Sequence, residues 1–166
     1  MAGPDRVAAL SEQLVHVHEA LRQRLVSLRQ EAADGAADGM AGAAALPKDL
    51  LGHCLSFCTA IGTHHSGEDN QLLPALRAAA PELAPVIDKL IEDHGLVAGI
   101  LQRVRELLPP GADRAAAGPG ALVRELDGLT AILESHFGYE ERRIAKALDG
   151  LGPEAWTADV FTPAAG

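Results

Sequence analysis

Four long segments of the chain repeat apolar residues every three or four positions, and proline- or glycine-rich stretches separate these segments. The spacing places the apolar side chains of each segment on one face of an α-helix. Asp-Gly pairs predict a loop over residues 34–46, and Pro74 predicts a kink or an end in the second helix. The predicted helices run from about Pro4 to Ala33, from Pro47 or Lys48 past Asn70, from Pro81–Pro85 to about Leu108, and from Gly120 to about Leu148.

The composition favours helices over strands. Ala and Leu are good helix formers, and only 3% of the 166 residues are aromatic. Four helices with short connections predict an all-α, up-down-up-down four-helix bundle over residues 1–149. The remaining residues, 150–166, contain the single Trp and are predicted to form an irregular tail.

Charge and cysteine content exclude several classes of protein. The net charge of −9 argues against direct nucleic-acid binding. The segment Leu50–Gly67 lacks charged residues, but its three histidines and its polar residues favour a buried helix over a membrane span. The N-terminus shows no secretory signal, and the two cysteines, Cys54 and Cys58, suggest no disulfide framework, so we expect a cytoplasmic protein.

A His-x3-Glu motif occurs twice, in the second and in the fourth predicted helix. In both copies a further histidine lies in the preceding helix. All four histidines lie on the apolar faces of their helices, and their distances from the helix ends place each pair at the same level of an antiparallel bundle. The residues are His18, His64 and Glu68 in the first copy and His94, His136 and Glu140 in the second.

Histidine and glutamate in this arrangement are suited to metal binding. Neutral imidazole binds iron, copper, nickel and zinc, and a carboxylate can bridge two ions. The pattern therefore predicts a site for two metal ions inside the bundle, with two imidazoles for each ion and with Glu68 and Glu140 bridging. His65 and Asp69 form a rival His-x3-acid pair one residue later, and His65 could instead support the site without binding metal.

At these residues the chain resembles the hemerythrin-like proteins, the HHE cation-binding family. The resemblance implies a four-helix bundle that holds two non-heme iron ions, oxo- or hydroxo-bridged, and that meets O2, hydrogen peroxide or nitric oxide as small ligands. It covers about residues 5–148 and rests on His18-Glu-Ala-Leu-Arg22, on His64-His65-Ser-Gly-Glu68-Asp69 with the following Leu72-Leu-Pro-Ala-Leu76, on His94, and on His136-x3-Glu140-Glu141.

Two departures separate the chain from the oxygen-carrying hemerythrins. Those proteins place a second ligating histidine four residues along the third helix, where this chain has Leu90 and Ala98 on either side of His94. They also use an aspartate five residues after the fourth-helix histidine, where this chain has Glu140 at four residues and Glu141 at five. The pattern is closer to that of actinobacterial hemerythrin-like proteins, and it argues against reversible oxygen carriage.

Three functions follow from this interpretation. The first is a peroxide-decomposing diiron oxidoreductase, because two imidazoles for each iron leave coordination positions open. In that case Tyr139 and His65 are candidate catalytic proton donors. The second is a module that binds, stores or senses O2 or nitric oxide without turnover, and the third is an oxygenase or oxidase that acts on a small organic molecule. Of the other histidines, His16 is predicted to face solvent and His53 to lie on the core face in a structural role.

Overall fold

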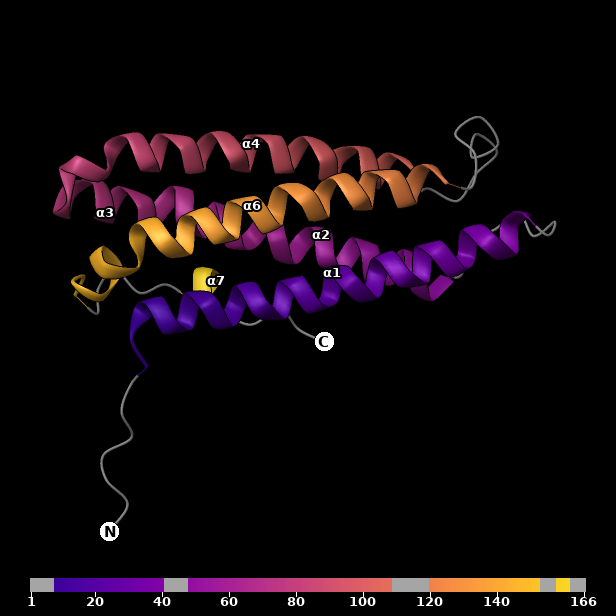
Figure 1. The fold of residues 1–166 in the computed structure, drawn as a ribbon, viewed down its shortest axis with the longest axis horizontal. Coiled ribbons are helices and arrows are strands. Elements are labelled where there is room, and N and C mark those ends of the chain that lie inside the picture. Colours follow the sequence, from indigo (N-terminus) through magenta and orange to yellow (C-terminus); the bar gives the residue numbers. More distant parts are fainter. Residues whose placement is uncertain (1–7, 41–47, 109–119, 153–157, 162–166) are drawn as a thin grey trace, which may run out of the picture.

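Four long helices lie side by side in the computed structural model, which describes residues 8–40, 48–108, 120–152 and 158–161 (Figure 1). Successive long helices run in opposite directions, and no strand occurs in these ranges. The predicted all-α four-helix bundle is confirmed. The helices of the bundle are α1 (Leu10–Met40), α2 (Lys48–Gly67), α4 (Ala84–Glu106) and α6 (Ala121–Asp149).

Helix α2 does not end at Pro74. It passes through a π-helical turn, η1 (Glu68–Leu72), into α3 (Leu73–Ala79), and a 3₁₀ turn, η2 (Pro81–Leu83), then leads to α4. In η1 the N–H of Leu73 donates to the carbonyl of Glu68, five residues back instead of four. Proline lacks an N–H and clashes with the preceding turn of an α-helix, and the wider π turn relieves this conflict. Pro74 therefore marks a change of helical register.

Helix α1 is longer than the sequence predicts. Residues 34–40, expected to be the start of a loop, continue the helix to Met40, while residues 41–46 and the expected start at Pro4 lie outside the described residues. Alanines at four positions between residues 32 and 37 favour helix enough to offset the glycines, each of which costs about 1 kcal/mol. The helix thus extends 22 residues beyond His18, whereas 16 separate His64 from the start of α2.

The C-terminal tail contains a short helix, α7 (Ala158–Phe161). This helix lies against α2 and α1, and both Val160 and Phe161 are buried (Figure 1). The expectation of a wholly irregular tail is therefore wrong for residues 158–161, because two apolar side chains are enough to dock the segment on the bundle. The single Trp lies outside the described residues.

A layer of polar residues separates two apolar cores. The first core includes Leu21, Ile61, Val97 and Leu133, and the second includes Leu14, Leu72, Leu90 and Ile144. In α1, α4 and α6, and in α2 continued by η1, the polar layer therefore lies between an apolar residue of one core and an apolar residue of the other. This arrangement fixes the height of the layer from both sides, because each core excludes water from it.

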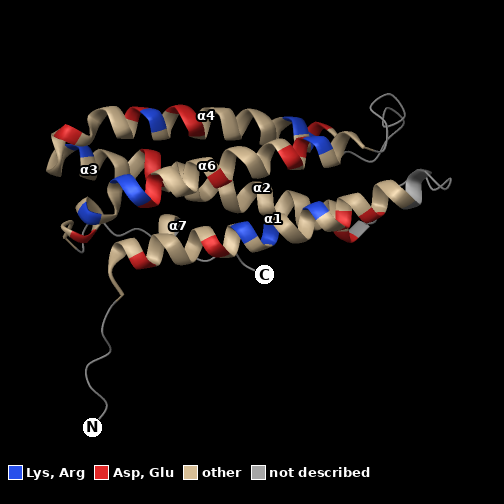
Figure 2. Ribbon diagram, in the orientation of Figure 1, with Lys and Arg blue, Asp and Glu red and all other residues tan. Residues whose placement is uncertain are grey.

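The two cysteines belong to the first core. Cys54 and Cys58 are both buried on α2, and burial raises the pKa of the Cys54 thiol to about 12. Helix α2 carries no charged residue between its first turn and Glu68 (Figure 2). Even so, none of the helices in the described ranges is long and apolar enough to cross a membrane.

Candidate metal centre

The polar layer consists of buried histidines and acids contributed by all four long helices and η1. Such groups are costly to bury unless each finds a partner, so their concentration at one level requires an explanation. We describe the layer as two halves. The first half contains His18 and His64, the second half contains His65, His94 and His136, and Glu68 and Glu140 lie between the two halves.

In the first half, two imidazoles point their Nε2 atoms at each other. The Nε2 atoms of His18 and His64 are 3.1 Å apart. Glu68 places Oε1 3.2 Å from Nε2 of His64, and Glu140 places Oε2 3.4 Å from Nε2 of His18. Four potential ligand groups from three different helical elements and η1 therefore converge on one point.

The second half meets the same two carboxylates from the other side. Glu68 Oε2 lies 3.2 Å from Nε2 of His94, and Glu140 Oε2 lies 3.6 Å from Nε2 of His136. His65 stacks on His94, with ring centroids 4.0 Å apart, and meets the ring of His136 edge-on at 5.1 Å. Ligand atoms of His65, Glu68, His94 and His136 all lie within 4.8 Å of one another.

The outer nitrogens of the first half are held by acceptors. His18 donates from Nδ1 to Glu141 Oε1 at 2.9 Å, and His64 donates from Nδ1 to the carbonyl of Val160 at 2.8 Å. Arg22 also donates to Glu141, at 3.0 Å. Although burial opposes it, these hydrogen bonds from His18 and Arg22 lower the pKa of Glu141, which keeps this carboxylate an acceptor.

The outer nitrogens of the second half face acidic side chains. His94 donates from Nδ1 to Asp69 Oδ1 at 2.7 Å. Asp93 Oδ2 lies 3.6 Å from Nδ1 of His136, which is too long for a hydrogen bond, and Asp93 is itself paired with Lys89. In metal sites of proteins, an outer acceptor of this kind fixes the tautomer of the ligating imidazole.

These outer acceptors determine which ring nitrogen carries the proton. Because the Val160 carbonyl and the Glu141 carboxylate only accept, His64 and His18 each carry their proton on Nδ1 when neutral. Their two Nε2 lone pairs then face each other at 3.1 Å with two carboxylates beside them. The oxygens of Glu68 and Glu140 are buried without hydrogen-bond partners, and a cation between these oxygens and the two lone pairs would satisfy all of them, so the residues fit a metal ion.

Burial favours the neutral form of six groups in this cluster. It lowers the pKa of His18, lowers the pKa of His64 and His65 well below the ordinary value, and lowers that of His136 to about 3. Burial also raises the pKa of Glu68 to about 8 and that of Glu140 well above its ordinary value. Neutral imidazoles are ready to bind a metal, whereas the two carboxyl groups must first release their protons.

Comparison with known protein families agrees with this geometry. The chain matches the family model of the hemerythrin HHE cation-binding domain over residues 9–148. The chain belongs to the hemerythrin family. No curated protein and no solved structure matches it. Membership identifies a metal-binding domain of a family that binds small ligands such as O2.

The hemerythrin domain brings together all six residues of the duplicated motif and adds one more. His65, which the sequence offered either as a rival or as a supporting residue, has its ring inside the second half, and its Nε2 is buried without a hydrogen-bond partner. Its companion Asp69 takes the outer position on His94 instead. His65 therefore lies within the cluster beside the motif residues, and Asp69 lies outside it as a hydrogen-bond acceptor.

The other candidate residues have different surroundings. Tyr139 is half-buried against the second core, with the guanidinium carbon of Arg143 5.5 Å from its ring centroid. His16 is exposed, as predicted. His53 does not lie on the core face, because its side chain is 59% exposed and pairs with Glu31 at 3.0 Å. Leu90 is packed in the second core, and Ala98 is exposed.

Three outer partners were missed by sequence reasoning. Asp93 directly precedes His94 and Glu141 directly follows Glu140, so an acid beside each motif residue was an available signal. The carbonyl of Val160 had no such signal, since any residue supplies a backbone carbonyl and 96 positions separate it from His64.

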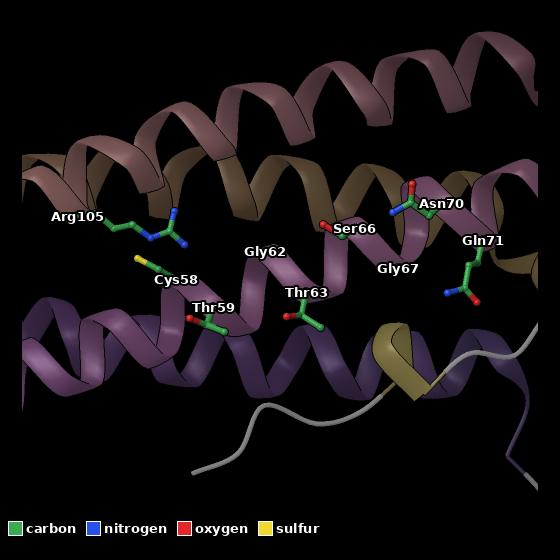
Figure 3. A pocket seen from close by; sticks show the side chains of 9 residues that line it. All are labelled: Cys58, Thr59, Gly62, Thr63, Ser66, Gly67, Asn70, Gln71 and Arg105. Atoms are coloured by element: carbon green, nitrogen blue, oxygen red, sulfur yellow. The ribbon is translucent and has the colours of Figure 1, made fainter.

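An open groove of about 390 Å³ runs along the other side of α2 (Figure 3). It is lined by small and polar side chains, with Arg105 from α4 at one end, and none of its lining residues belongs to the polar layer. Its lining residues are Cys58, Thr59, Gly62, Thr63, Ser66, Gly67, Asn70, Gln71 and Arg105.

Proposed function

We propose that this hemerythrin domain binds two iron ions in the polar layer and decomposes hydrogen peroxide. The observation that carries the proposal is the pair of buried carboxylates, Glu68 and Glu140, each within 3.6 Å of one imidazole nitrogen from either half. Glu68 directs Oε1 to His64 and Oε2 to His94, whereas Glu140 directs Oε2 to both His18 and His136, and a carboxylate that faces two imidazole groups is suited to bridging two ions.

In this proposal the first ion is held by His18 and His64 and the second by His94 and His136, with His65 available to the second. Glu68 and Glu140 are shared. When bound, iron supplies the change of oxidation state that peroxide decomposition requires. In the overall reaction one peroxide gives up two electrons and two protons and leaves as O2, while another accepts them and leaves as two waters.

The chain itself supports the handling of these protons. Glu141 accepts from His18 and is 21% exposed, and Asp69 accepts from His94 and is 35% exposed. Each carboxylate therefore joins a buried imidazole to the solvent and can hold or release a proton at its edge. A reaction that moves protons in every cycle benefits from such links, whereas storage of a bound gas does not require them.

The two halves contain different numbers of imidazoles, and this difference also supports turnover of peroxide. Two imidazoles lie in the first half and three in the second, so an ion in the first half retains more positions for peroxide. His65 and Tyr139 remain candidate proton donors in the proposal. Of these, His65 has a buried, unpartnered Nε2 within the cluster, and Tyr139 lies against the second core.

A second candidate function is reversible binding of O2 or nitric oxide. The observation that favours it is His65, because a third imidazole in the second half replaces the one that the third helix lacks at Leu90 and Ala98. Additional neutral donors stabilise the ferrous state, in which O2 binds.

The test is anaerobic reconstitution with ferrous iron, followed by addition of hydrogen peroxide or O2. We expect about two irons per chain, rapid oxidation in air, and evolution of O2 from peroxide over many turnovers. A stable optical spectrum of an O2 complex through repeated oxygenation cycles, without O2 evolution from peroxide, would favour the second candidate. A chain that takes up no iron would contradict both.

A further inference from the structure

Helix α7 contacts the polar layer through the carbonyl oxygen of Val160. The other outer partners of the cluster, Glu141, Asp69 and Asp93, are side chains on α6, η1 and α4. Among the outer partners in the described ranges, the one that His64 uses is a backbone carbonyl, and this carbonyl comes from the C-terminal segment. The orientation of one imidazole in the first half thus depends on an element outside the bundle.

Two buried side chains hold α7 in place. Val160 is 0% exposed and Phe161 is 7% exposed, and both belong to the second core together with Leu14 of α1 and Leu72 of η1. Because α7 is only four residues long, it has little stability of its own and depends on these contacts. The Val160 carbonyl therefore reaches His64 only when the segment is docked.

Undocking of α7 would change the first half in a defined way. Without the carbonyl, Nδ1 of His64 has no acceptor, and the neutral ring is free to carry its proton on Nε2 instead. Nε2 is the atom that faces Glu68 at 3.2 Å and His18 at 3.1 Å, so a proton there competes with a metal ion. In the second half the outer nitrogens of His94 and His136 face Asp69 and Asp93 instead.

We propose that α7 is a positioning element for His64, which couples docking of the C-terminal segment to metal binding in the first half. The inference rests on the proposed metal site and adds to it that one ion, and not the other, depends on the tail. By thermodynamic linkage the coupling is reciprocal. Docking raises the affinity for the ion by a given factor, and a bound ion raises the equilibrium constant for docking by the same factor.

The test uses full-length variants. Val160→Asp places a charge in the second core and undocks α7, and Phe161→Ala weakens docking without adding a charge. Val26→Asp is the matched control, because Val26 is 62% exposed on α1. Affinity for each of two ferrous ions is measured anaerobically by competition with a chromophoric chelator, and circular dichroism verifies the helix content.

We expect Val160→Asp to loosen one of the two ferrous ions by roughly 10–100-fold, the usual effect of losing an outer partner of a ligating histidine. Phe161→Ala changes the same ion in the same direction by less, and Val26→Asp changes neither. Wild-type affinity for both ions in a folded Val160→Asp variant would overturn the inference and leave the proposed function intact. Failure of the wild-type chain to bind iron would overturn both.

A measurement on the wild-type chain covers the case in which a variant fails to fold. Hydrogen exchange of the amides of residues 158–161 is compared in the metal-free and iron-loaded protein. Reciprocal coupling predicts exchange slower by about 10–100-fold in the loaded protein, matching the loss of affinity in the variant. Equal exchange rates in the two forms would show that the tail does not sense the ion.

Discussion

The two halves of the polar layer use the same residue types but support them differently. In the first half, one outer partner is a carboxylate and the other is the Val160 carbonyl. In the second half Asp69 accepts from His94, Asp93 lies 3.6 Å from Nδ1 of His136 without a hydrogen bond, and His65 adds a third imidazole. Each half thus has one hydrogen-bonded carboxylate partner, and from the additional imidazole we infer that the second half holds an ion more tightly and the first half is more open to a small ligand.

The largest effect is expected when a carboxylate shared by the two halves is replaced. Glu68→Gln deletes a negative charge that contacts His64 in one half and His94 in the other. We expect both ions to be lost or weakened more than about 100-fold, as for a directly ligating group. Elemental analysis after dialysis measures this, with the exposed Glu12→Gln as control. Loss of only one ion would show that Glu68 serves a single half.

Removal of one histidine should separate the halves. His64→Ala is expected to release the first ion and to leave the second, whereas His136→Ala releases the second, because each side chain has its Nε2 in only one half. His16→Ala, which alters an exposed ring, should retain both. Iron content per chain provides the measurement. Two irons in His64→Ala would move the site to the register of His65 and Asp69.

Metal removal should lower the melting temperature by about 10 °C. An ion that binds only the folded chain at 1,000 times its dissociation constant contributes about 4 kcal/mol, and each kcal/mol shifts the melting temperature of a chain of this size by roughly 2–4 °C. Differential scanning calorimetry of loaded and metal-free protein measures the gap. Equal melting temperatures would mean that the buried histidines need no metal.

This gap should widen between pH 6.5 and pH 8. In the metal-free protein the pKa of Glu68 is raised to about 8, so its contribution to stability is fully present below its ordinary value and is lost as the pH rises through 8. The histidines act at lower pH, since their lowered pKa values remove stability only as the pH falls below about 6.5. Over this window the metal-free protein should lose roughly 1–2 kcal/mol from Glu68 alone.

The smallest expected effect concerns His65. His65→Ala makes the second half resemble the first, with two imidazoles, and leaves the contacts of His18 and His64 intact. We expect about a tenfold loss of affinity for one ion and faster oxidation of the ferrous protein in air, measured by stopped-flow absorbance. Unchanged affinity would place His65 outside the ligand set and retain it as a proton donor.

The sequence was sufficient to predict the bundle and the convergence of the six residues of the repeated motif, because apolar periodicity indicates both the helices and the face on which each of the four motif histidines lies. His64 and Glu68, four residues apart, share a face in any α-helix. The predicted residue counts to the helix ends are too short for α1, which continues to Met40, yet His18 and His64 still meet because the apolar stripes set their level.

The remaining features depend on contacts between distant parts of the chain. The π turn at Glu68–Leu72 arises from the hydrogen-bond pattern before Pro74, and propensity alone does not distinguish it from a kink. His53 was placed on the core face by periodicity, but α2 turns it outward to Glu31 of α1. The Val160 carbonyl is the extreme case, since a backbone group has no signature in the sequence.

The burial of Cys54 bears on how long such a protein remains intact. Hydrogen peroxide oxidises cysteine through the thiolate, and a thiol whose pKa is about 12 has only about one thiolate in 10⁵ molecules at pH 7. Cys58 is also buried, and burial raises its pKa in the same direction. In the proposed reaction with peroxide, burial would therefore keep both thiols in the reduced state, and the packing that builds the first core would slow self-inactivation.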